Sequence, residues 1–361
     1  MGAKPLKGQK AQKGQKAQKG FILAAVLWVL AIMLIAVGIF HAYVQRKLAV
    51  GLQAKAHIQQ HLDNYSTEQT LLYVLSTSRT TLAGFTFTKL TVEQGLDENF
   101  SFSSAVGDEL WADGTVYQGL GNTQFTVQDN AGLISVNASD TSVLSNFIDH
   151  FEPDPGTRTR LISTLQDYID ADDLLSLSGA EKLDYVAKNI PAPTNDFLRT
   201  SPELMNVLGW REWLSQHPEF DVQNWLSVGR FSIVNLNTMP KSLLLSYLGL
   251  SEQLTDQLIV ERKTNPFRSV EDFILRTNLI LTLDEDRYRF LPGNDLRLKI
   301  WNKGGGQARL ISLQLTPNGL LGPWLVDYEY SVQSVENNNE ALAIRQSNLF
   351  NPTLGNDRRG H

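Results

Sequence analysis

Four aspartates and one glutamate are concentrated in the stretch DYIDADDLLSLSGAE. Asp167, Asp170, Asp172 and Asp173 fall within seven residues, and Glu181 follows eight residues later. So many carboxylates at the expected end of a helix repel one another and oppose the negative end of the helix dipole. A hard cation relieves this repulsion, and Ca²⁺ accepts irregular coordination by about six to eight oxygens. The five carboxylates therefore predict a Ca²⁺ site.

This stretch is not an EF-hand, because the sixth position of a loop that starts at Asp170 is Leu175 and not glycine. The alternative to a metal site is a solvated acidic turn in which some of the carboxylates cap helices. A melting temperature that rises with calcium and falls with a chelator would distinguish the two, because a ligand of the folded state alone stabilises that state.

A second chemical signal lies at Gly20 and Phe21, where a lysine-rich leader meets the uncharged segment FILAAVLWVLAIMLIAVGIF. The segment is long enough to cross a bilayer as a helix, which takes about 20 apolar residues. The preceding lysines predict a cytoplasmic N-terminus. A secretory signal peptide has a shorter apolar core with its cleavage site after it, whereas the candidate cut here precedes the apolar core. A plain single-span anchor with a basic leader is the alternative.

Two further patterns carry weaker signals. His57 and His61 have the i, i+4 spacing of helical metal ligands, but no third ligand accompanies them, which favours a solvated helix face. The stretch LGLSEQLTDQLIVER resembles a helix-hairpin-helix, a fold that holds DNA through hairpin amides and nearby basic residues. Here Gly249 is followed by Glu252 and Asp256, which favours simple helix packing.

Composition excludes other classes of function. The sequence has 38 acidic and 32 basic residues, and six of the lysines lie in the first twenty positions, so the remainder carries 26 basic against 38 acidic residues. This acidic body argues against a nucleic-acid partner. The chain has no cysteine and therefore no disulfide, thiolate metal site or thiol nucleophile. No G-x-S-x-G, P-loop or Rossmann glycine pattern occurs, and we predict that the chain is not an enzyme.

The elements that position these residues follow from hydrophobic periodicity. After the apolar segment, one helical face continues through Leu48, Leu52, Ile58, Leu62, Tyr65, Leu72 and Leu75. Alternating stretches before residue 137 and after residue 293 predict strands, and Gly304–Gly306 predicts a hairpin turn. The predicted order is a basic leader (1–20), a transmembrane and stem helix (21–80), the first part of a sheet (81–137), an inserted helical domain (138–292), the second part of the sheet (293–335) and a polar tail (336–361).

Start and stop signals divide the inserted domain into helices. Ser201–Pro202 predicts a cap with proline in the first turn, Gly249 a helix end, Ser251 the next start, and Ser269 with Asp272 a capping box.

The inserted domain also contains a faint repeat between ISVNASDTSVLSNF and VNLNTMPKSLLLSY. The matched pairs are Asn137 with Asn237, Ser142 with Ser242, and Leu144 with Leu244. The repeat predicts two related helical subdomains, the second resembling a helix-hairpin-helix; coincidence is the alternative.

The junction KG-FILAAVLWVLAIMLI resembles a type IV prepilin signal, and the resemblance implies cleavage after Gly20 and methylation of Phe21. Most members have Glu at the fifth mature residue, where a carboxylate among apolar helices needs a positive partner; this chain has Ala25. That replacement resembles the protein K family of type II secretion minor pseudopilins, and so do the segments DYIDADDLLSLSGAEKLDYV, SPELMNVLGW and IVNLNTMPKSLLLSYLGLSEQLTDQLIVERKTNPFRSVEDFI. Together these similarities extend from about residue 10 to residue 335.

The resemblance implies a type IV pilin-like α+β fold, in which a long N-terminal helix packs on an antiparallel sheet, with a large all-α insertion. It implies a non-enzymatic minor pseudopilin in the bacterial inner membrane, with its head in the periplasm at the tip of the pseudopilus, supporting export of folded proteins. The resemblance also implies Ca²⁺ binding in the inserted domain.

The implied partners are minor pseudopilins I and J, major pseudopilin G, pseudopilin H as a further candidate, the prepilin peptidase and inner-membrane lipid, with no nucleic acid. The alternatives are a stand-alone anchored periplasmic binding protein and a helix-hairpin-helix DNA-binding protein of a DNA-uptake pilus.

Overall fold

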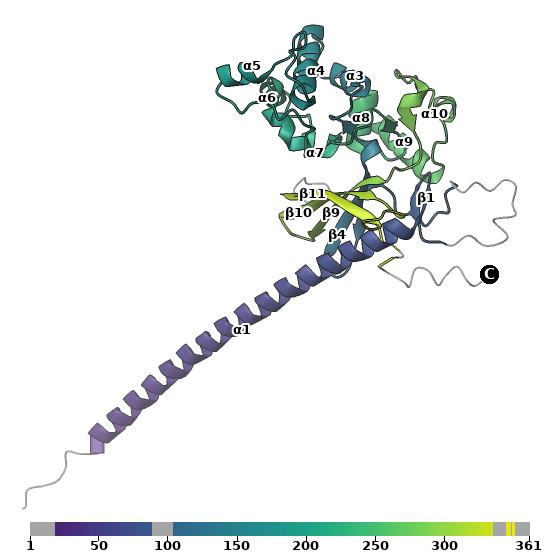
Figure 1. The fold of residues 1–361 in the computed structure, drawn as a ribbon. Coiled ribbons are helices and arrows are strands. Elements are labelled where there is room, and N and C mark those ends of the chain that lie inside the picture. Colours follow the sequence, from purple (N-terminus) through teal and green to yellow (C-terminus); the bar gives the residue numbers. More distant parts are fainter. Residues whose placement is uncertain (1–18, 89–103, 335–343, 348, 351–361) are drawn as a thin grey trace, which may run out of the picture. The chain divides into compact units, whose positions relative to one another are not determined.

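A computed structural model describes residues 19–88, 104–334, 344–347 and 349–350 (Figure 1). A long helix comes first, and strands of one sheet come before and after a series of short helices. This arrangement confirms the predicted α+β fold with a large inserted helical region. The predicted leader and most of the polar tail lie outside the described residues, and the domain boundaries stay a prediction.

The main sheet of the described residues is antiparallel throughout and has the strand order β11-β10-β9-β4-β3 (Figure 1). Its strands are β3 (Asp113–Gln118), β4 (Thr123–Asp129), β9 (Asp295–Asn302), β10 (Gln307–Leu315) and β11 (Trp324–Gln333). The pairing of β4 with β9 joins the two predicted parts of the sheet. The predicted hairpin turn lies between β9 and β10, where Gly304 has a φ of 73° that glycine adopts without strain.

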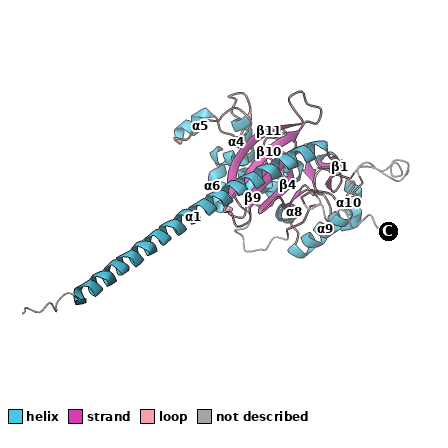
Figure 2. Cartoon of the chain, turned by 90° about the horizontal axis from the view of Figure 1, so that it is seen from below, coloured by secondary structure: helices cyan, strands magenta, loops and turns pink. Residues whose placement is uncertain are grey.

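The helix α1 (Lys19–Thr77) packs its last turns on one face of this sheet (Figure 2). Leu71, Leu72 and Leu75 are buried in one cluster with Phe125 and Leu298. Burying each leucine contributes about 1.5–3 kcal/mol. The other members of the predicted apolar face, from Leu48 to Tyr65, are more than half exposed.

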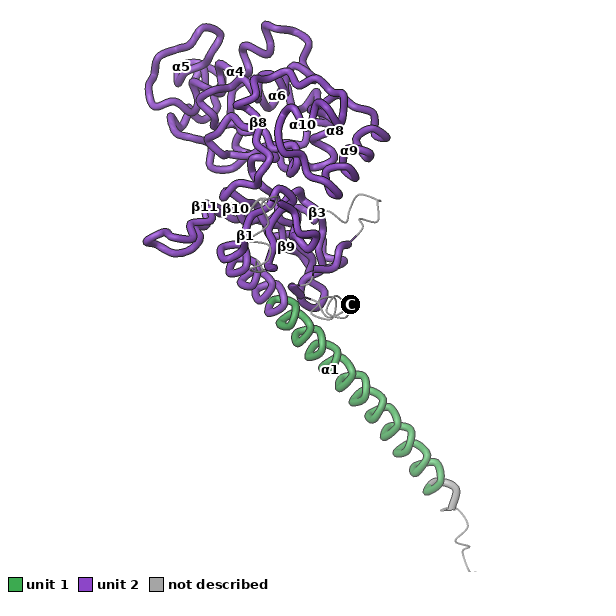
Figure 3. The backbone as a smooth tube through the Cα atoms, turned by 90° about the vertical axis from the view of Figure 1, so that its right-hand side faces the viewer, with its two compact units in different colours: residues 1–61 green, residues 62–361 purple. Residues whose placement is uncertain are grey.

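The chain divides into two compact units, residues 1–61 and 62–361 (Figure 3). In the first unit, the apolar side chains of α1 from Ile22 to Phe40 are exposed. Among the described residues, one helix segment, Ile22–Thr77, is long and apolar enough to cross a membrane by length and composition, with a mean hydropathy of 3.0 in its most apolar window. These properties suggest a single membrane anchor.

The sequence predicts that residues from 81 onward join the main sheet, and for the first strands this is wrong. The strands β1 (Arg79–Thr81) and β2 (Gly84–Thr86) pair with each other in a separate hairpin. Gly84 has a φ of 146°, and a Cβ there would lie 2.2 Å from the carbonyl oxygen of Leu110. The chain therefore pairs Phe85 with Leu110 through two backbone hydrogen bonds. Residues 89–92, which the sequence also assigned to a strand, lie outside the described residues.

The inserted region lies on the opposite side of the sheet from the end of α1 (Figure 1). Its helices are α3 (Ser142–Asp149), α4 (Pro155–Ile169), α5 (Lys182–Ala187), α6 (Trp210–Gln216), α7 (Val222–Trp225), α8 (Lys241–Leu248), α9 (Glu252–Thr264) and α10 (Val270–Thr277). The 3₁₀ turns η1 (Asn130–Gly132), η2 (Ser201–Asn206) and η3 (Glu285–Arg287) accompany them.

The insertion is not purely helical. It contains two parallel strand pairs among its described residues, β5 (Ile134–Ser135) with β6 (Leu226–Ser227) and β7 (Val234–Asn235) with β8 (Tyr288–Arg289). Two residues are too short for the alternation that reveals a strand in a sequence. Each pair joins the beginning and the end of one half of the insertion. The first half extends from β5 to just past β6, and the second half from β7 to just past β8.

Several helix boundaries follow the predicted signals. Gly249 ends α8 with a φ of 61°, and the Ser251 hydroxyl caps α9 by accepting a hydrogen bond from Leu254 N. Ser269 caps α10 in the same way, through Asp272 N. At Ser201–Pro202 the structure differs, because this segment begins the 3₁₀ turn η2, which follows Thr200.

The asparagines of the sequence repeat make equivalent hydrogen bonds. Asn137 accepts from Leu198 N and donates to the carbonyl oxygens of Leu198 and Val228. Asn237 accepts from Phe267 N and donates to the carbonyl oxygens of Phe267 and Phe290. Each amide thus ties the start of one half of the insertion to two later segments of that half.

Candidate functional site

The acidic stretch lies at the end of α4 and in the loop that leads to α5. Asp154 caps the start of α4 by accepting from Thr157 N, and Pro155 occupies the first turn. The apolar residues of α4 face the core of the insertion. Asp167 lies on the buried side of the helix with them and is fully buried. Asp170 follows the last helical residue as the C-cap.

The loop after α4 folds back over Asp167. Ser176 N donates to Asp167 Oδ2 at 3.2 Å. A Cβ at Gly179 would lie 1.9 Å from the same oxygen, so any other residue there would have to displace the carboxylate. Glu181 follows as the N-cap of α5 and is 8% exposed, and its backbone N donates to Asp184 Oδ2 at 3.0 Å.

Four carboxylate oxygens in this region are buried without a hydrogen-bond partner: Asp167 Oδ1, Asp170 Oδ1 and both side-chain oxygens of Glu181. Burial raises the pKa of Asp170, and the negative charges of Asp172 and Asp167 raise it further. Burial likewise raises the pKa of Glu181, with additional repulsion from Asp167, Asp170 and Asp173. An unpartnered buried carboxylate oxygen is costly, and a bound cation would remove this cost. The chemistry of Asp167, Asp170 and Glu181 therefore suits a cation, but in the described structure the three side chains are not arranged as a ligand set.

Asp172 and Asp173 are exposed and take part in bonds of the loop. Asp172 accepts from Leu174 N, and Asp173 accepts from Asn195 Nδ2 at 3.0 Å. In the described part of the chain, no three His, Asp or Glu side chains are arranged to hold a metal ion. The structure thus brings the predicted carboxylates into one neighbourhood, and the ligand set stays a prediction.

The predicted processing residues lie in the first turns of α1. Gly20 and Phe21 follow its first residue, Lys19, and the side chain of Phe21 lies outside the described part of the structure. Ala25 lies on the same helix and is exposed. Farther along α1, the rings of His57 and His61 stand 4.5 Å apart edge to face.

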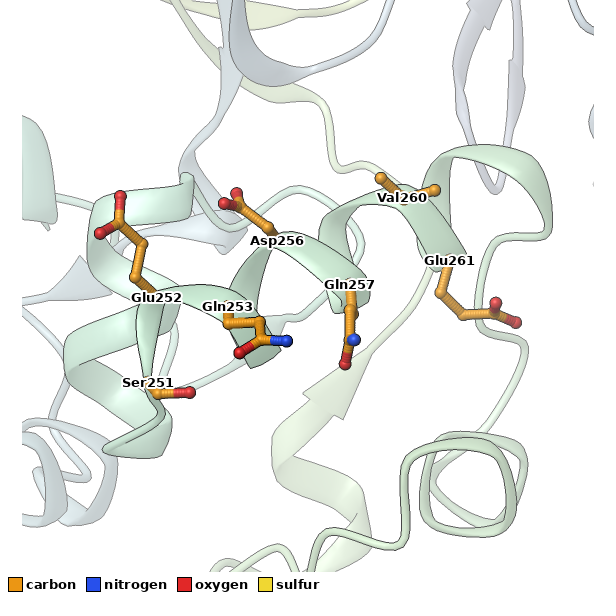
Figure 4. Close-up of a pocket in the computed structure, with 7 residues that line it drawn as sticks. All are labelled: Ser251, Glu252, Gln253, Asp256, Gln257, Val260 and Glu261. Atoms are coloured by element: carbon orange, nitrogen blue, oxygen red, sulfur yellow. The ribbon is translucent and has the colours of Figure 1, made fainter.

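The hairpin of α8 and α9 presents an acidic surface. A shallow hollow runs along α9 and is lined by Glu252, Asp256 and Glu261 together with uncharged side chains (Figure 4). Lys241 on α8 is held by Asp256 at 2.7 Å and Glu252 at 3.5 Å. Carboxylates on this face repel phosphate, which favours helix packing over DNA binding.

A buried ion pair was missed at the sequence level. Arg262 near the end of α9 lies 3.2 Å from Asp113 on β3, and it also donates to Leu236 O at 2.7 Å. Burial alone raises the pKa of Asp113, but the charges of Arg262 and Lys263 and the hydrogen bonds from Thr115 outweigh this and lower it. Positions 113 and 262 are far apart in the chain, and no local pattern links them.

A second contact between sheet and insertion had a signal that sequence reasoning did not use. Arg297 on β9 donates to the carbonyl oxygens of Gln223 and Leu226 at the end of α7, both at 2.9 Å. In DLRLKIW the leucines at 296 and 298 face α1, so alternation places Arg297 on the other face. A buried arginine between leucines on a central strand indicates that polar groups cover that face.

Residues 234–285 match the family model described as type II secretion system (T2SS), protein K. This match confirms the resemblance to protein K for the segment from β7 to the start of η3. Among solved structures, the chain is similar to one from the GspK-GspI-GspJ complex of the enterotoxigenic Escherichia coli type 2 secretion system. The identity is 17% and the TM-score 0.49, over 78% of this chain and 99% of that chain. No curated protein matches the chain.

Proposed function

We propose that this chain is a minor pseudopilin of a type II secretion system. The observation that carries the proposal is the match of residues 234–285 to the protein K family. An apolar N-terminal helix whose last turns pack on an antiparallel sheet supports it, as does the prepilin-like junction at Gly20 and Phe21. The function is structural, so the chain is not an enzyme.

The proposed position is the tip of the pseudopilus, with minor pseudopilins I and J as partners. The bulk of the insertion supports a tip position, because a large domain would collide with neighbours along a packed shaft. The similar solved chain comes from a complex named for its K, I and J components. The exposed stem face from Leu48 to Tyr65 supplies apolar surface for neighbouring stems. Major pseudopilin G, and H as a further candidate, would lie below.

The proposed location is the bacterial inner membrane, with one span, a cytoplasmic N-terminus and a periplasmic head. The prepilin peptidase would cut after Gly20 and methylate Phe21. Mass spectrometry of the membrane-extracted protein should find a mature N-terminus at Phe21, and Gly20→Ala should block processing. An intact Met1 in cells that contain the peptidase would contradict the proposal.

Partner binding gives the second test. The detergent-solubilised full chain should capture the soluble heads of proteins I and J at micromolar concentrations. Deletion of the chain should impair secretion. Normal secretion after deletion, with no capture of I or J, would instead support a stand-alone anchored binding protein.

We also propose Ca²⁺ as the cation of the acidic stretch. Asp167, Asp170 and Glu181 supply buried oxygens without partners, and Asp172 and Asp173 are the further candidate ligands. Bound there, Ca²⁺ would supply positive charge and nothing more. The residues of the chain shape the loop: Ser176 N donates to Asp167, and Gly179 leaves room for the carboxylate beside the loop.

A further inference from the structure

The two edges of the main sheet differ in one respect. At the β3 edge, Arg345 N donates to Val116 O at 2.9 Å, and Gln118 N donates to Arg345 O at 3.1 Å. The chain thus covers that edge with a segment of its own. At the other edge, β11 pairs in the described residues with β10 alone. Open edges are usually protected in native proteins, because unpaired backbone groups bind other strands.

The direction of the backbone groups of β11 follows from its pairing with β10. Thr316 N donates to Pro323 O at 2.8 Å, which makes these two residues a hydrogen-bonded pair. Bonded and non-bonded pairs alternate in antiparallel sheets. Trp324, opposite Leu315, and Val326, opposite Leu313, therefore point their N–H and C=O groups away from β10.

The turn before β11 adds exposed apolar side chains. Leu320 and Leu321 are fully and 85% exposed, and Val326 is 49% exposed. The turn is held in shape by Thr316, whose hydroxyl donates to Gly322 O at 2.8 Å. No charged residue occurs from position 316 to position 326.

Along β11, the features that hinder pairing with another strand, a β-bulge and charged side chains, begin only after Val326. The register shifts there, which leaves Asp327 as the extra residue of a β-bulge. Glu329 is paired with Arg309 at 2.6 Å. Asp327 is exposed and forms no ion pair within the described residues. The charge of Arg230 acts on its carboxylate from farther away, so a Lys or Arg of a partner would be the first cation in direct contact with it.

We propose that the β11 edge from Trp324 to Val326, with the Leu320–Leu321 turn, binds an extended segment of a partner protein that adds to the sheet as a further strand. Outward N–H and C=O groups are matched by the backbone of another strand and not by lipid. The apolar turn and the charge of Asp327 specify the partner: uncharged apolar residues beside the turn, next to a Lys or Arg that reaches the carboxylate. This surface goes beyond the proposed function, which does not assign it.

The test uses the full chain in the cells that produce it, with a photocrosslinking benzophenone residue at position 320. The companion variant is Val326→Pro, which removes an outward N–H that β10 does not use and is tolerated at such an edge position. The matched control is Val326→Thr, which keeps both the N–H and the β-branched shape. A crosslinker at Leu275, equally exposed on α10 at 84%, controls for non-specific capture.

We expect one protein adduct from position 320, with its crosslinked peptide carrying apolar residues beside a Lys or Arg. Its yield should fall at least about tenfold with Val326→Pro, because a strand hydrogen bond is lost and a buried carbonyl is left unpaired. The yield should persist with Val326→Thr. An adduct with lipid, an adduct with a second copy of this chain, equal yield from position 275, or yield unchanged by Val326→Pro would each overturn the proposal. Unchanged thermal melting of Val326→Pro excludes misfolding as the cause.

Discussion

The two halves of the insertion use one plan and differ in what they bury at the same place. The first half has Leu198, whose backbone binds Asn137, and then Arg199, whose N–H donates to Glu203 at 2.9 Å. The second half has Phe267 bound to Asn237, and then Arg268, whose N–H donates to Asp272 at 2.9 Å. These bonds correspond one to one.

The halves diverge between the second helix and this shared segment. Only Asn265 and Pro266 separate α9 from Phe267, whereas residues 170–197 separate α4 from Leu198. The additional segment holds most of the acidic stretch and large exposed apolar side chains, including Leu177 and Leu183.

The third-last residue of each second helix is a buried charge. In α9 it is Arg262, which the sheet neutralises through Asp113. In α4 it is Asp167, which has no ion pair among the described residues and faces more carboxylates. The second half thus obtains its counter-charge from the protein itself. The other half lacks one, which supports the proposal of a bound cation.

The largest expected effect concerns the half that is already neutralised. Arg262→Met should lower the free energy of unfolding by about 3–5 kcal/mol, because it leaves the Asp113 carboxylate buried without a counter-charge. Urea unfolding of the detergent-solubilised chain, followed by tryptophan fluorescence, measures this. The double variant with Asp113→Asn should recover a large part of the loss. A loss below about 1 kcal/mol for the single variant would show that the buried Asp113 carboxylate does not depend on its ion pair with Arg262.

The next largest loss of stability should follow replacement of the two repeat asparagines, and it should be equal in the two halves. Asn137→Ala and Asn237→Ala should each cost about 3 kcal/mol, since each leaves buried backbone groups unpaired. The same unfolding assay compares them directly. Asn137→Asp, which keeps the acceptor oxygen and loses both donors, should also be destabilising. Costs that differ between the two alanine variants by more than about 1.5 kcal/mol would break the equivalence of the halves.

Calcium should stabilise the first half only. At a free concentration of about 100 times the Kd, it should raise the free energy of unfolding by about 2.7 kcal/mol, and a chelator should reverse the effect. Differential scanning calorimetry with calcium or chelator measures this.

Asp167→Asn and Glu181→Gln should abolish the response to calcium, whereas Asp172→Ala and Asp173→Ala should weaken it. With chelator present, Glu181→Gln should melt above the unchanged protein, because it removes repulsion. Asp272→Asn in the second half is the matched control and should respond normally. A melting temperature indifferent to both calcium and chelator would remove the metal site.

The smallest effect is expected at the surface of the additional segment. Leu177 is 92% exposed, so Leu177→Ser should change the free energy of unfolding by less than about 0.5 kcal/mol. Leu165→Ser, at a fully buried position of α4, is the contrasting control and should be strongly destabilising. A large cost at Leu177 would mean that the segment is part of the core of that half.

Much of the fold could be predicted because its signals are local. Twenty uncharged residues specify an apolar helix whatever follows, and Ser251, Ser269 and Gly249 mark helix ends through their own side chains or backbone freedom. The prediction that β1 and β2 join the main sheet is wrong, because alternation shows that a segment is extended but not which strand it pairs with. That choice depends on Gly84 and Leu110, which approach each other only in the folded chain.

The candidate site likewise has features that local sequence predicts and features that depend on packing. The gathering of carboxylates in the last turn of α4 and the loop after it could be predicted, since their spacing along the chain is short and repulsion follows from proximity alone. Only the tertiary structure decided that Asp167 and Glu181 are buried with unpartnered oxygens, while Asp172 and Asp173 remain outside. It also decided that Arg262 meets Asp113. Burial and long-range pairing depend on which segments pack together, and desolvation is set by that packing and not by the order of the residues.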